Sequence, residues 1–364
     1  MHNEVNMVRK KKLSKHQQRR LEINHTSRQQ LRETPNSNDD QQNVADSLFS
    51  EPKTGLVISR YGKLADVEDE IGYTHRCNIR RTLPALVTGD RVIFRPSQDS
   101  KEKGIIDAIL DRKSQFVRPD YYNGIKLVAS NIDQIIIVSA VMPHLSMNII
   151  DRYCVACEIM KIKPLILLNK IDLLSLGDKK IVAKQLSIYE NIGYRVLFVS
   201  QKTQEGIASL KQVLADKTTI FVGQSGVGKS SLINLMLPTE QIQASVNAIS
   251  LNSGLGQHTT TATKLYHLRT GGSIIDSPGV REFGLWHLES NDVGLGFIEF
   301  QDYFGHCRYR DCKHRNDPGC ALLAAVNKGQ IAQSRFNNYH RILETMIEMK
   351  TKNHRAYKQD KDKE

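Results

Sequence analysis

A phosphate-binding loop decides the fold class of this chain. The stretch Gly223-Gln224-Ser225-Gly226-Val227-Gly228-Lys229-Ser230 follows the apolar run 218–222 and precedes a helix-like segment that begins at Ser231. It fits the pattern G-x-x-x-x-G-K-[ST], in which glycines let backbone N–H groups converge on phosphate oxygens and the following helix offers its positive end. We predict that residues 223–231 bind nucleotide phosphates, with Lys229 at the outer phosphates and Ser230 as a ligand of Mg²⁺.

Strands and helices alternate around this loop. Apolar strands are predicted over residues 134–139, 164–168, 195–199, 218–222, 263–268 and 273–275, with helical segments between them. Such an alternation predicts a layered α/β domain with a mostly parallel sheet.

A second motif indicates which base the site would bind. Asn169-Lys170-Ile171-Asp172 comes directly after the strand 164–168. A carboxylate at Asp172 presents two acceptors to the two donors on guanine N1 and N2, whereas adenine offers the opposite pattern. We predict that these four residues bind a guanine base.

Two further segments complete a GTPase-like set. Asp276-Ser277-Pro278-Gly279 has the D-x-x-G form, which places a carboxylate near Mg²⁺ and the glycine N–H near the γ-phosphate. In the loop 254–261, the hydroxyls of Thr259 and Thr260 are candidates to complete the coordination of Mg²⁺, and the sequence does not choose between them.

The order of these motifs is unusual. In ordinary GTPases the N-K-x-D motif follows the phosphate loop, but here it precedes the loop. The sequence therefore predicts a circularly permuted P-loop GTPase domain.

Four potential metal ligands lie near the carboxyl end. Cys307, Cys312, His314 and Cys320 form the pattern C-x₄-C-x-H-x₅-C, which suits tetrahedral Zn²⁺. Because all four positions would be filled by protein, we predict a structural zinc; the alternative is a set of free thiols. Basic residues in this loop favour a contact with an RNA backbone: Arg308, Arg310, Lys313 and Arg315.

Composition and charge limit the classes of protein to consider. The 364 residues, of which 40% are hydrophobic and 25% charged, exclude a disordered or fibrous chain and allow two to three domains at about 150 residues each. The net charge of +12 is concentrated at the ends, since residues 1–33 hold nine Lys/Arg against three Asp/Glu, and residues 335–364 hold eight against five. Basic ends are typical of a polyanion-binding protein, although solubility alone is an alternative.

No apolar run reaches the 18 or more residues of a membrane helix, and no secretory signal follows the basic amino end. We expect a cytoplasmic protein that does not enter membranes. The predicted organisation is a basic flexible arm over 1–50, a small all-β barrel over 51–118, the permuted GTPase domain over 119–285, and a zinc-binding helical domain over 286–364.

The chain resembles the circularly permuted ribosome-assembly GTPases of the RsgA/YjeQ family. Besides the permuted motifs and the zinc loop, the resemblance is carried by the arm around Lys11, Lys15, Arg19 and Arg20 and by residues 131–134 and 148–153. It implies a multidomain fold with an OB-fold barrel. It also implies a GTP hydrolase that binds the small (30S) ribosomal subunit and its rRNA late in maturation, with hydrolysis stimulated by the subunit and used for factor release.

The remaining candidate site residues come from family patterns and, for His258, from its being the only titratable side chain in the loop 254–261. A base-contacting S-A-x segment is expected after the strand 195–199, where the chain reads Ser200-Gln201-Lys202, so Ser200 is a predicted base-binding residue and Gln201 departs from the pattern. Val280 stands where many GTPases carry a water-positioning glutamine, which predicts slow intrinsic turnover. His258 is the candidate catalytic residue that positions the water; alternatively, it caps its loop or contacts RNA.

Two other functions are compatible with these patterns. One is a nucleic-acid-stimulated ATPase, which would lack a preference for GTP over ATP. The other is a non-catalytic RNA-binding module that GTP stabilises. The expected partners are GTP or GDP, the small subunit with its rRNA, and other subunit-maturation factors, and the absence of a long heptad pattern favours a monomer.

Overall fold

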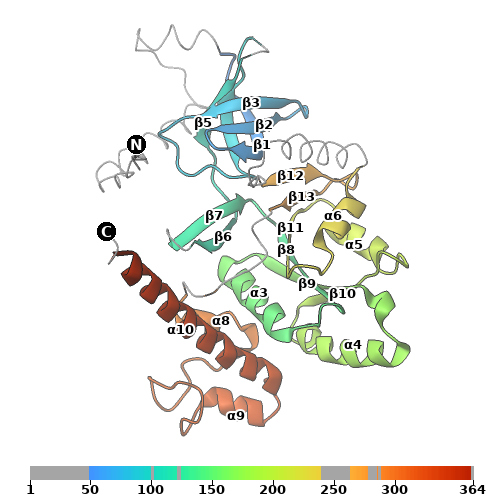
Figure 1. Cartoon of the computed structure of the whole chain (residues 1–364), viewed down its shortest axis with the longest axis vertical. Coiled ribbons are helices and arrows are strands. Elements are labelled where there is room, and N and C mark those ends of the chain that lie inside the picture. Colours follow the sequence, from blue (N-terminus) through green and yellow to red (C-terminus); the bar gives the residue numbers. More distant parts are fainter. Residues whose placement is uncertain are drawn as a thin grey trace, which may run out of the picture. The chain divides into compact units, whose positions relative to one another are not determined.

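The computed structural model describes residues 49–99, 102–120, 124–238, 263–277, 285 and 288–361 (Figure 1). Within this part, the chain forms two compact units. The first contains residues up to 86 together with 90–111, and the second contains 87–89 together with the residues from 112 onward.

The first unit is a five-stranded barrel. Its strands are β1 (Lys53–Tyr61), β2 (Leu64–Asp69), β3 (Thr74–Ile79), β4 (Arg91–Arg95) and β5 (Gly104–Ile109). They pair in the order β1-β2-β3-β5-β4, and β4 pairs with β1 to close the barrel. The expected small OB-like barrel is confirmed. Three of the six residues of β2 are acidic, namely Asp66, Glu68 and Asp69.

Alternating side chains fill the barrel. Val57, Val67 and Phe94 are fully buried there together with Cys77. Burial raises the pKa of Cys77 to about 12, so this thiol is a neutral core group. Gly55 permits the close approach of β1 to its neighbours, because a Cβ at this position would lie 2.5 Å from a methyl carbon of Val67.

The second unit contains a six-stranded sheet. Its strands are β8 (Gln134–Ala140), β9 (Lys163–Asn169), β10 (Arg195–Phe198), β11 (Thr218–Val222), β12 (Lys264–His267) and β13 (Ser273–Asp276), in the order β10-β9-β8-β11-β13-β12. All neighbours are parallel except β12, which runs antiparallel to β13. The predicted mostly parallel α/β sheet is therefore confirmed.

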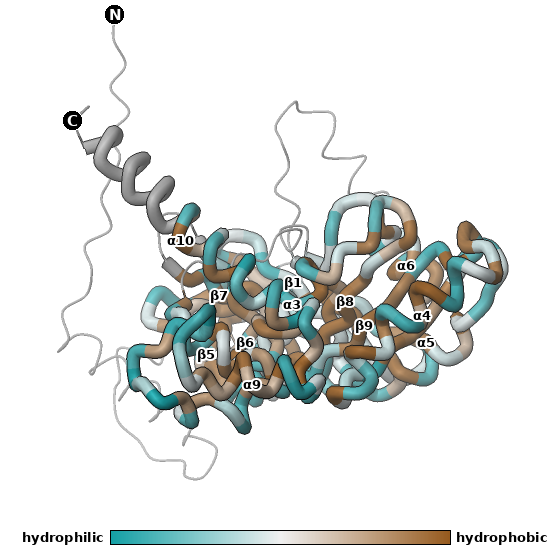
Figure 2. Tube along the Cα trace, turned by 90° about the horizontal axis from the view of Figure 1, so that it is seen from below, coloured by the Kyte–Doolittle hydropathy of each residue, from teal (hydrophilic) through white to brown (hydrophobic). Residues whose placement is uncertain are grey.

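Helices cover this sheet. They are α3 (Met147–Met160), α4 (Leu176–Asn191), α5 (Ile207–Leu214) and α6 (Lys229–Met236). Leu210 of α5 and Leu232 of α6 share one core cluster with Ile136 of β8, whereas α3 packs on β8 and β9 outside that cluster. All seven residues of β8 are buried, as expected for a strand covered on both faces, and β8 and β9 are largely brown in the hydropathy view of Figure 2.

A separate hairpin precedes the sheet. It consists of β6 (Gln115–Asp120) and β7 (Gly124–Ser130), which pair only with each other among the described strands. The sequence analysis did not anticipate this hairpin, and the expected domain boundary after residue 118 falls within β6.

The carboxyl-terminal part is helical, with the short helices α8 (Ser290–Leu295) and η2 (Ile298–Phe300), α9 (Ala321–Asn327) and the long α10 (Gln333–Lys361). One face of α10 is buried through Phe336, Tyr339, Ile342 and Met346. The neighbouring Leu343 is only half-buried. Within the described residues, no helix combines the length and the apolar character that crossing a membrane requires.

Candidate nucleotide-binding and metal sites

Four parallel strands bring the predicted nucleotide residues to one edge of the sheet. The phosphate loop follows β11, Asn169 ends β9, Ser200 comes shortly after β10, and Asp276 ends β13. Because these strands are parallel, their carboxyl ends meet at the same edge, which is where open α/β sheets bind ligands.

Glycines shape the phosphate loop. Gly223 has φ 140°, and a Cβ at this position would lie 2.2 Å from the carbonyl oxygen of Val138 in β8. Gly228 has φ 94°, and a Cβ there would lie 2.4 Å from Nδ2 of Asn169. Only glycine fits where the loop passes β8 and where it meets the N-K-x-D motif. Helix α6 then begins at Lys229, so the first N–H groups of α6 adjoin the loop.

The lysine of the loop is turned inward. Nζ of Lys229 donates to the carbonyl oxygens of Gly223 at 2.6 Å and of Gln224 at 2.5 Å. Ser230 and Ser231 lie in the first turn of α6 and are exposed. The structure thus places one cation and two hydroxyls beside the glycine-rich backbone.

Asn169 and Lys170 connect the N-K-x-D motif to the phosphate loop. Asn169 is 2% exposed, and its Nδ2 donates to the carbonyl oxygen of Val227 at 2.9 Å. Nζ of Lys170 donates to the carbonyl oxygens of Gly226 at 2.7 Å and of Met142 at 2.8 Å. The structure therefore brings together two motifs that are about fifty residues apart, through side chains that the sequence suggested only as base ligands.

Ser200 holds the carboxylate of Asp172. Oγ of Ser200 is buried and donates to Oδ1 of Asp172 at 2.7 Å, and it accepts from the backbone N–H of Thr203 at 3.2 Å. Ile171 anchors the same turn because its side chain is buried. Asp172 thus has a fixed orientation at the end of the sheet.

Gln201 follows in the position where the family pattern has a small residue. Its Nε2 is buried and has no hydrogen-bond partner among the described residues. A buried amide nitrogen without a hydrogen-bond partner costs free energy, so the side chain of Gln201 is an unfavourable replacement for a small residue at this position.

The other predicted nucleotide residues are only partly described. Asp276 is exposed at the end of β13, and the adjacent Ser277 accepts from Oγ1 of Thr263 at 3.2 Å. His258, Thr259, Thr260 and Gly279, and the predicted arm before residue 49, lie outside the described residues.

The four predicted metal ligands do come together. One ligand atom from each of Cys307, Cys312, His314 and Cys320 lies within 4.8 Å of the others. Nδ1 of His314 is 3.4 Å from Sγ of Cys307 and 3.5 Å from Sγ of Cys320. Tetrahedral zinc bonds of about 2.0–2.3 Å separate neighbouring ligand atoms by about 3.5 Å. The group could therefore hold a metal ion, and its dimensions suit zinc.

The surroundings of this group favour a bound cation. Burial and the neighbouring thiols raise the pKa of Cys312 to about 12, so a metal ion that binds this thiolate would have to displace its proton. Backbone N–H groups of Ala321 and Leu323 donate to the sulfurs of Cys307 and Cys320, each at 3.4 Å. Nε2 of His340 in α10 donates to the carbonyl oxygen of His314 at 2.8 Å, which ties the loop to the last helix.

A buried ionic network lies between α3 and the carboxyl-terminal helices. Arg335 is 1% exposed and donates to Asp151 at 2.5 Å and to both carboxylate oxygens of Glu299 at 2.7 and 3.0 Å. Nδ2 of Asn338 and the hydroxyl of Tyr189 donate to Asp151 at 2.6 and 2.5 Å. Burial raises the pKa of Asp151, and these donors oppose the rise by stabilising the carboxylate.

The sequence analysis assigned no role to these residues. The sequence contained one indication of a buried ion pair. Asp151 lies on α3 between the apolar Ile150 and the buried Cys154, and a charged residue at such a position is rarely buried without a partner.

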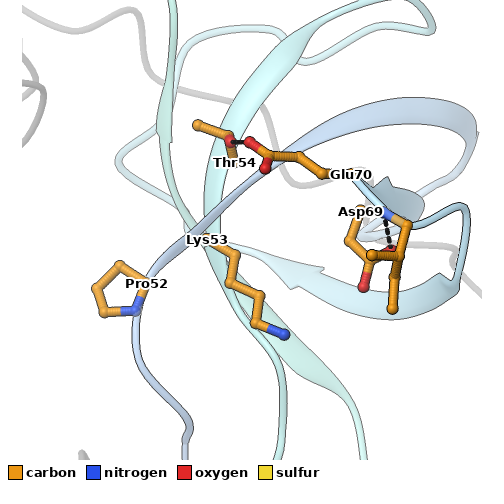
Figure 3. Close-up of a pocket in the computed structure, with 6 residues that line it drawn as sticks. Pro52, Lys53, Thr54, Asp69 and Glu70 are labelled. Atoms are coloured by element: carbon orange, nitrogen blue, oxygen red, sulfur yellow. Dashed lines mark hydrogen bonds between the residues drawn. The ribbon is translucent and has the colours of Figure 1, made fainter.

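A cavity of about 340 Å³ lies on the barrel and is separate from all predicted residues (Figure 3). Its lining includes Thr54, whose hydroxyl donates to Glu70 at 2.6 Å, and Asp69, whose carboxylate accepts from the backbone N–H groups of Ile71 and Tyr73 and contacts Nε2 of His75 at 2.9 Å. The acidic groups of this cavity are thus already engaged within the barrel.

The permuted order of the motifs and the parallel sheet define a circularly permuted P-loop GTPase, and its carboxyl-terminal part carries a Cys₃His group that could hold a metal ion. The family model described as RsgA GTPase matches residues 109–286. Small ribosomal subunit biogenesis GTPase RsgA from Klebsiella pneumoniae (strain 342) is 56% identical over 357 residues, which cover 97% of this chain and 99% of that protein. The protein of the same name from Yersinia enterocolitica is 55% identical and covers 94% of this chain and 97% of its own length. The chain belongs to the RsgA family of GTPases.

Solved structures agree with this assignment. The crystal structure of YjeQ from Thermotoga maritima is 32% identical, covers 82% of this chain and 99% of its own, and has a TM-score of 0.65. YloQ, described as a circularly permuted GTPase, is 29% identical, covers 83% of this chain and 96% of its own, and has a TM-score of 0.64.

Proposed function

We propose that the chain binds GTP at the carboxyl edge of its sheet and hydrolyses it to GDP and phosphate on the small ribosomal subunit. The observation that carries this proposal is the junction of the two motifs. Asn169 and Lys170 are hydrogen-bonded to the phosphate loop, and Asp172 is held by Ser200 at the end of the same sheet. A single nucleotide could therefore contact the loop with its phosphates and Asp172 with its base.

The phosphate loop supplies positioning and charge. Backbone N–H groups of residues 223–231 would bind the phosphates, and Lys229 would exchange its loop carbonyls for the outer phosphate oxygens. Ser230, Asp276 and one of Thr259 and Thr260 would hold Mg²⁺, which neutralises charge that develops on the phosphates. The N–H of Gly279 would contact the γ-phosphate.

The N-K-x-D motif supplies base selection. An ionised Asp172 offers two acceptors to N1–H and the N2 amino group of guanine, and Ser200 fixes their direction. Hydrogen bonds from Asn169 and Lys170 attach this motif to the phosphate loop, and the buried side chain of Ile171 attaches it to the core.

Hydrolysis would be slow without a partner. Val280 cannot orient a water, so His258 is the residue that we expect to position it once the small subunit orders the loop.

The relatives support the cellular assignment, since they are named small ribosomal subunit biogenesis GTPases. We infer that the partner is the small (30S) subunit with its rRNA, that hydrolysis drives release of this protein or another maturation factor, and that the protein works as a cytoplasmic monomer. Cys307, Cys312, His314 and Cys320 would hold one structural zinc. The functional parts are the basic arm (1–50), the barrel (51–118), the GTPase domain (119–285) and the zinc-binding domain (286–364).

Exchange of Asp172 for Asn tests base recognition directly. Asn presents one donor and one acceptor, which match xanthine instead of guanine. We expect Asp172→Asn to weaken GTP binding by on the order of 10- to 100-fold and to improve XTP binding, as measured by competition against a fluorescent guanine nucleotide. Glu190→Gln, at the exposed end of α4, is the matched control and should change neither affinity. Equal competition by ATP and GTP in the unaltered protein would favour the ATPase alternative and contradict the proposal.

A further inference from the structure

The segment Arg308-Tyr309-Arg310-Asp311 is held at both ends. It lies between Cys307 and Cys312, two members of the Cys₃His group. Within it, the backbone N–H of Arg308 donates to the carbonyl oxygen of Gly319 at 3.0 Å, and the N–H of Cys312 donates to the carbonyl oxygen of Tyr309 at 3.4 Å. The segment is therefore a short turn fixed at its base.

An aromatic ring stands exposed on this turn. Tyr309 is 47% exposed, whereas Tyr153, Tyr189 and Tyr339 of the same unit are 3% exposed or less. The guanidinium carbon of Arg308 lies 5.5 Å from the centroid of the Tyr309 ring, within the range of a cation–π contact. Two flat groups thus lie together on the surface of the turn.

The turn and the residues that directly follow it carry several positively charged side chains. Arg310 and Lys313 are exposed and form no ion pair with a described residue, while Arg315 is paired with Glu344 at 2.8 Å. The carboxylate of Asp317 accepts from the backbone N–H groups of Lys313 and Arg315, at 3.2 and 3.4 Å, and so holds the base of the loop. Arg310 and Lys313, which follow Tyr309 closely in the chain, therefore remain available to bind an anion.

We propose that Tyr309 and Arg308 form a stacking platform for an unpaired nucleobase of RNA, with Arg310 and Lys313 at the adjacent phosphates. Bases splayed out of single-stranded RNA stack on aromatic rings and guanidinium planes, and flanking Lys and Arg neutralise the backbone. An acidic protein partner would be bound by the cations alone, and the exposed ring would then have no role in binding. The proposal rests on the proposed function in that the chain meets RNA on the small subunit.

Variants at residue 309 separate stacking from other roles of the tyrosine. Tyr309→Phe keeps the ring, and Tyr309→Leu keeps an apolar side chain of moderate size without a ring. We expect the full chain with Tyr309→Leu to bind a fluorescent single-stranded oligouridine about 10-fold more weakly than the unaltered chain, and Tyr309→Phe to bind within about twofold of it. Arg310→Ala and Lys313→Ala should each reduce the slope of log K against log salt concentration by about 1, which corresponds to the loss of one phosphate contact.

Controls make the outcomes decisive. Zinc content and GTP affinity should be equal in all variants, which shows that the loop and the nucleotide site are intact. An oligomer with abasic spacers should bind the unaltered chain and both Tyr309 variants alike, because it offers no base to stack. The stacking proposal would be contradicted if Tyr309→Leu and Tyr309→Phe bound the RNA equally well, whether or not both bound it more weakly than the unaltered chain. Full displacement of the RNA by polyglutamate would also contradict it. If small subunits fail to accelerate GTP hydrolysis by the unaltered protein, the proposed function fails instead, whatever the variants show.

Discussion

Arg335→Met would break the buried ionic network without shortening the side chain greatly. Arg335 links Asp151 of α3 to Glu299 of η2, and its guanidinium carbon also lies 4.5 Å from the ring centroid of Phe297. Methionine keeps the unbranched apolar stem but donates no hydrogen bond. The variant therefore leaves two carboxylates facing an apolar side chain.

The expected loss follows from the burial of these carboxylates. Removing one partner from a buried ion pair typically costs about 3–5 kcal/mol, because the other charge stays buried. Asp151 keeps the donors of Tyr189 and Asn338, which favours the lower end of that range. About 3 kcal/mol corresponds to a roughly 100-fold increase in the fraction of molecules in which α10 has separated from α3.

Hydrogen exchange by mass spectrometry measures this opening directly. Backbone amides of α3 and of the first turns of α10 should exchange about 100-fold faster in Arg335→Met, while amides of the barrel should not change. Adding Asp151→Asn to the same chain removes the stranded charge and should recover about half of the loss. Exchange rates within threefold of the unaltered protein, or a double variant that is less stable than Arg335→Met, would refute this account of the network.

The same variant should respond to pH in a defined direction. Burial raises the pKa of Asp151 in the folded state, and loss of the guanidinium raises it further. The folded protein then binds a proton at a pH where the unfolded chain does not, so stability is present at low pH and is lost as pH rises through the folded pKa. As the pH falls toward the raised folded-state pKa of Asp151, the difference in stability between Arg335→Met and the double variant should therefore shrink.

Three other predictions concern the sites. Ser200→Ala should weaken GTP binding about 5- to 10-fold in calorimetry without affecting ATP, because Asp172 loses its fixed orientation; an equal loss for both nucleotides would argue against that role. His258→Ala should abolish subunit-stimulated hydrolysis at normal GTP affinity, with Gln257→Ala as the neighbouring control, and an unaltered stimulated rate would exclude the catalytic role. Chelation or Cys312→Ser should release one zinc per chain and expose the amides of α9 to exchange, whereas purified protein without zinc would contradict the metal assignment.

The sequence was most informative where function depends on local patterns. The phosphate loop, the N-K-x-D motif and the Cys₃His spacing each lie within a few residues of chain, and the structure brings each set together. The order of the first two motifs was enough to predict the permutation, and the similar structure of YloQ is also described as a circularly permuted GTPase.

Contacts between distant residues could not be predicted in this way. Arg335 and Asp151 are 184 positions apart, and no local sequence pattern around either residue predicts that they pair. The hydrogen bonds from Asn169 and Lys170 to the phosphate loop depend likewise on the pairing of strands in the folded sheet. Strand β2 has no apolar run that would predict it, because three of its six residues are acidic.

We propose that GTP hydrolysis by this chain depends on the small ribosomal subunit. The most direct test is single-turnover hydrolysis of GTP by the purified protein, alone and with isolated small subunits, with large subunits and ATP as controls. We expect slow hydrolysis by the protein alone and acceleration that is confined to GTP and the small subunit. A rate that small subunits leave unchanged, or that large subunits or ATP reproduce, would contradict the claim.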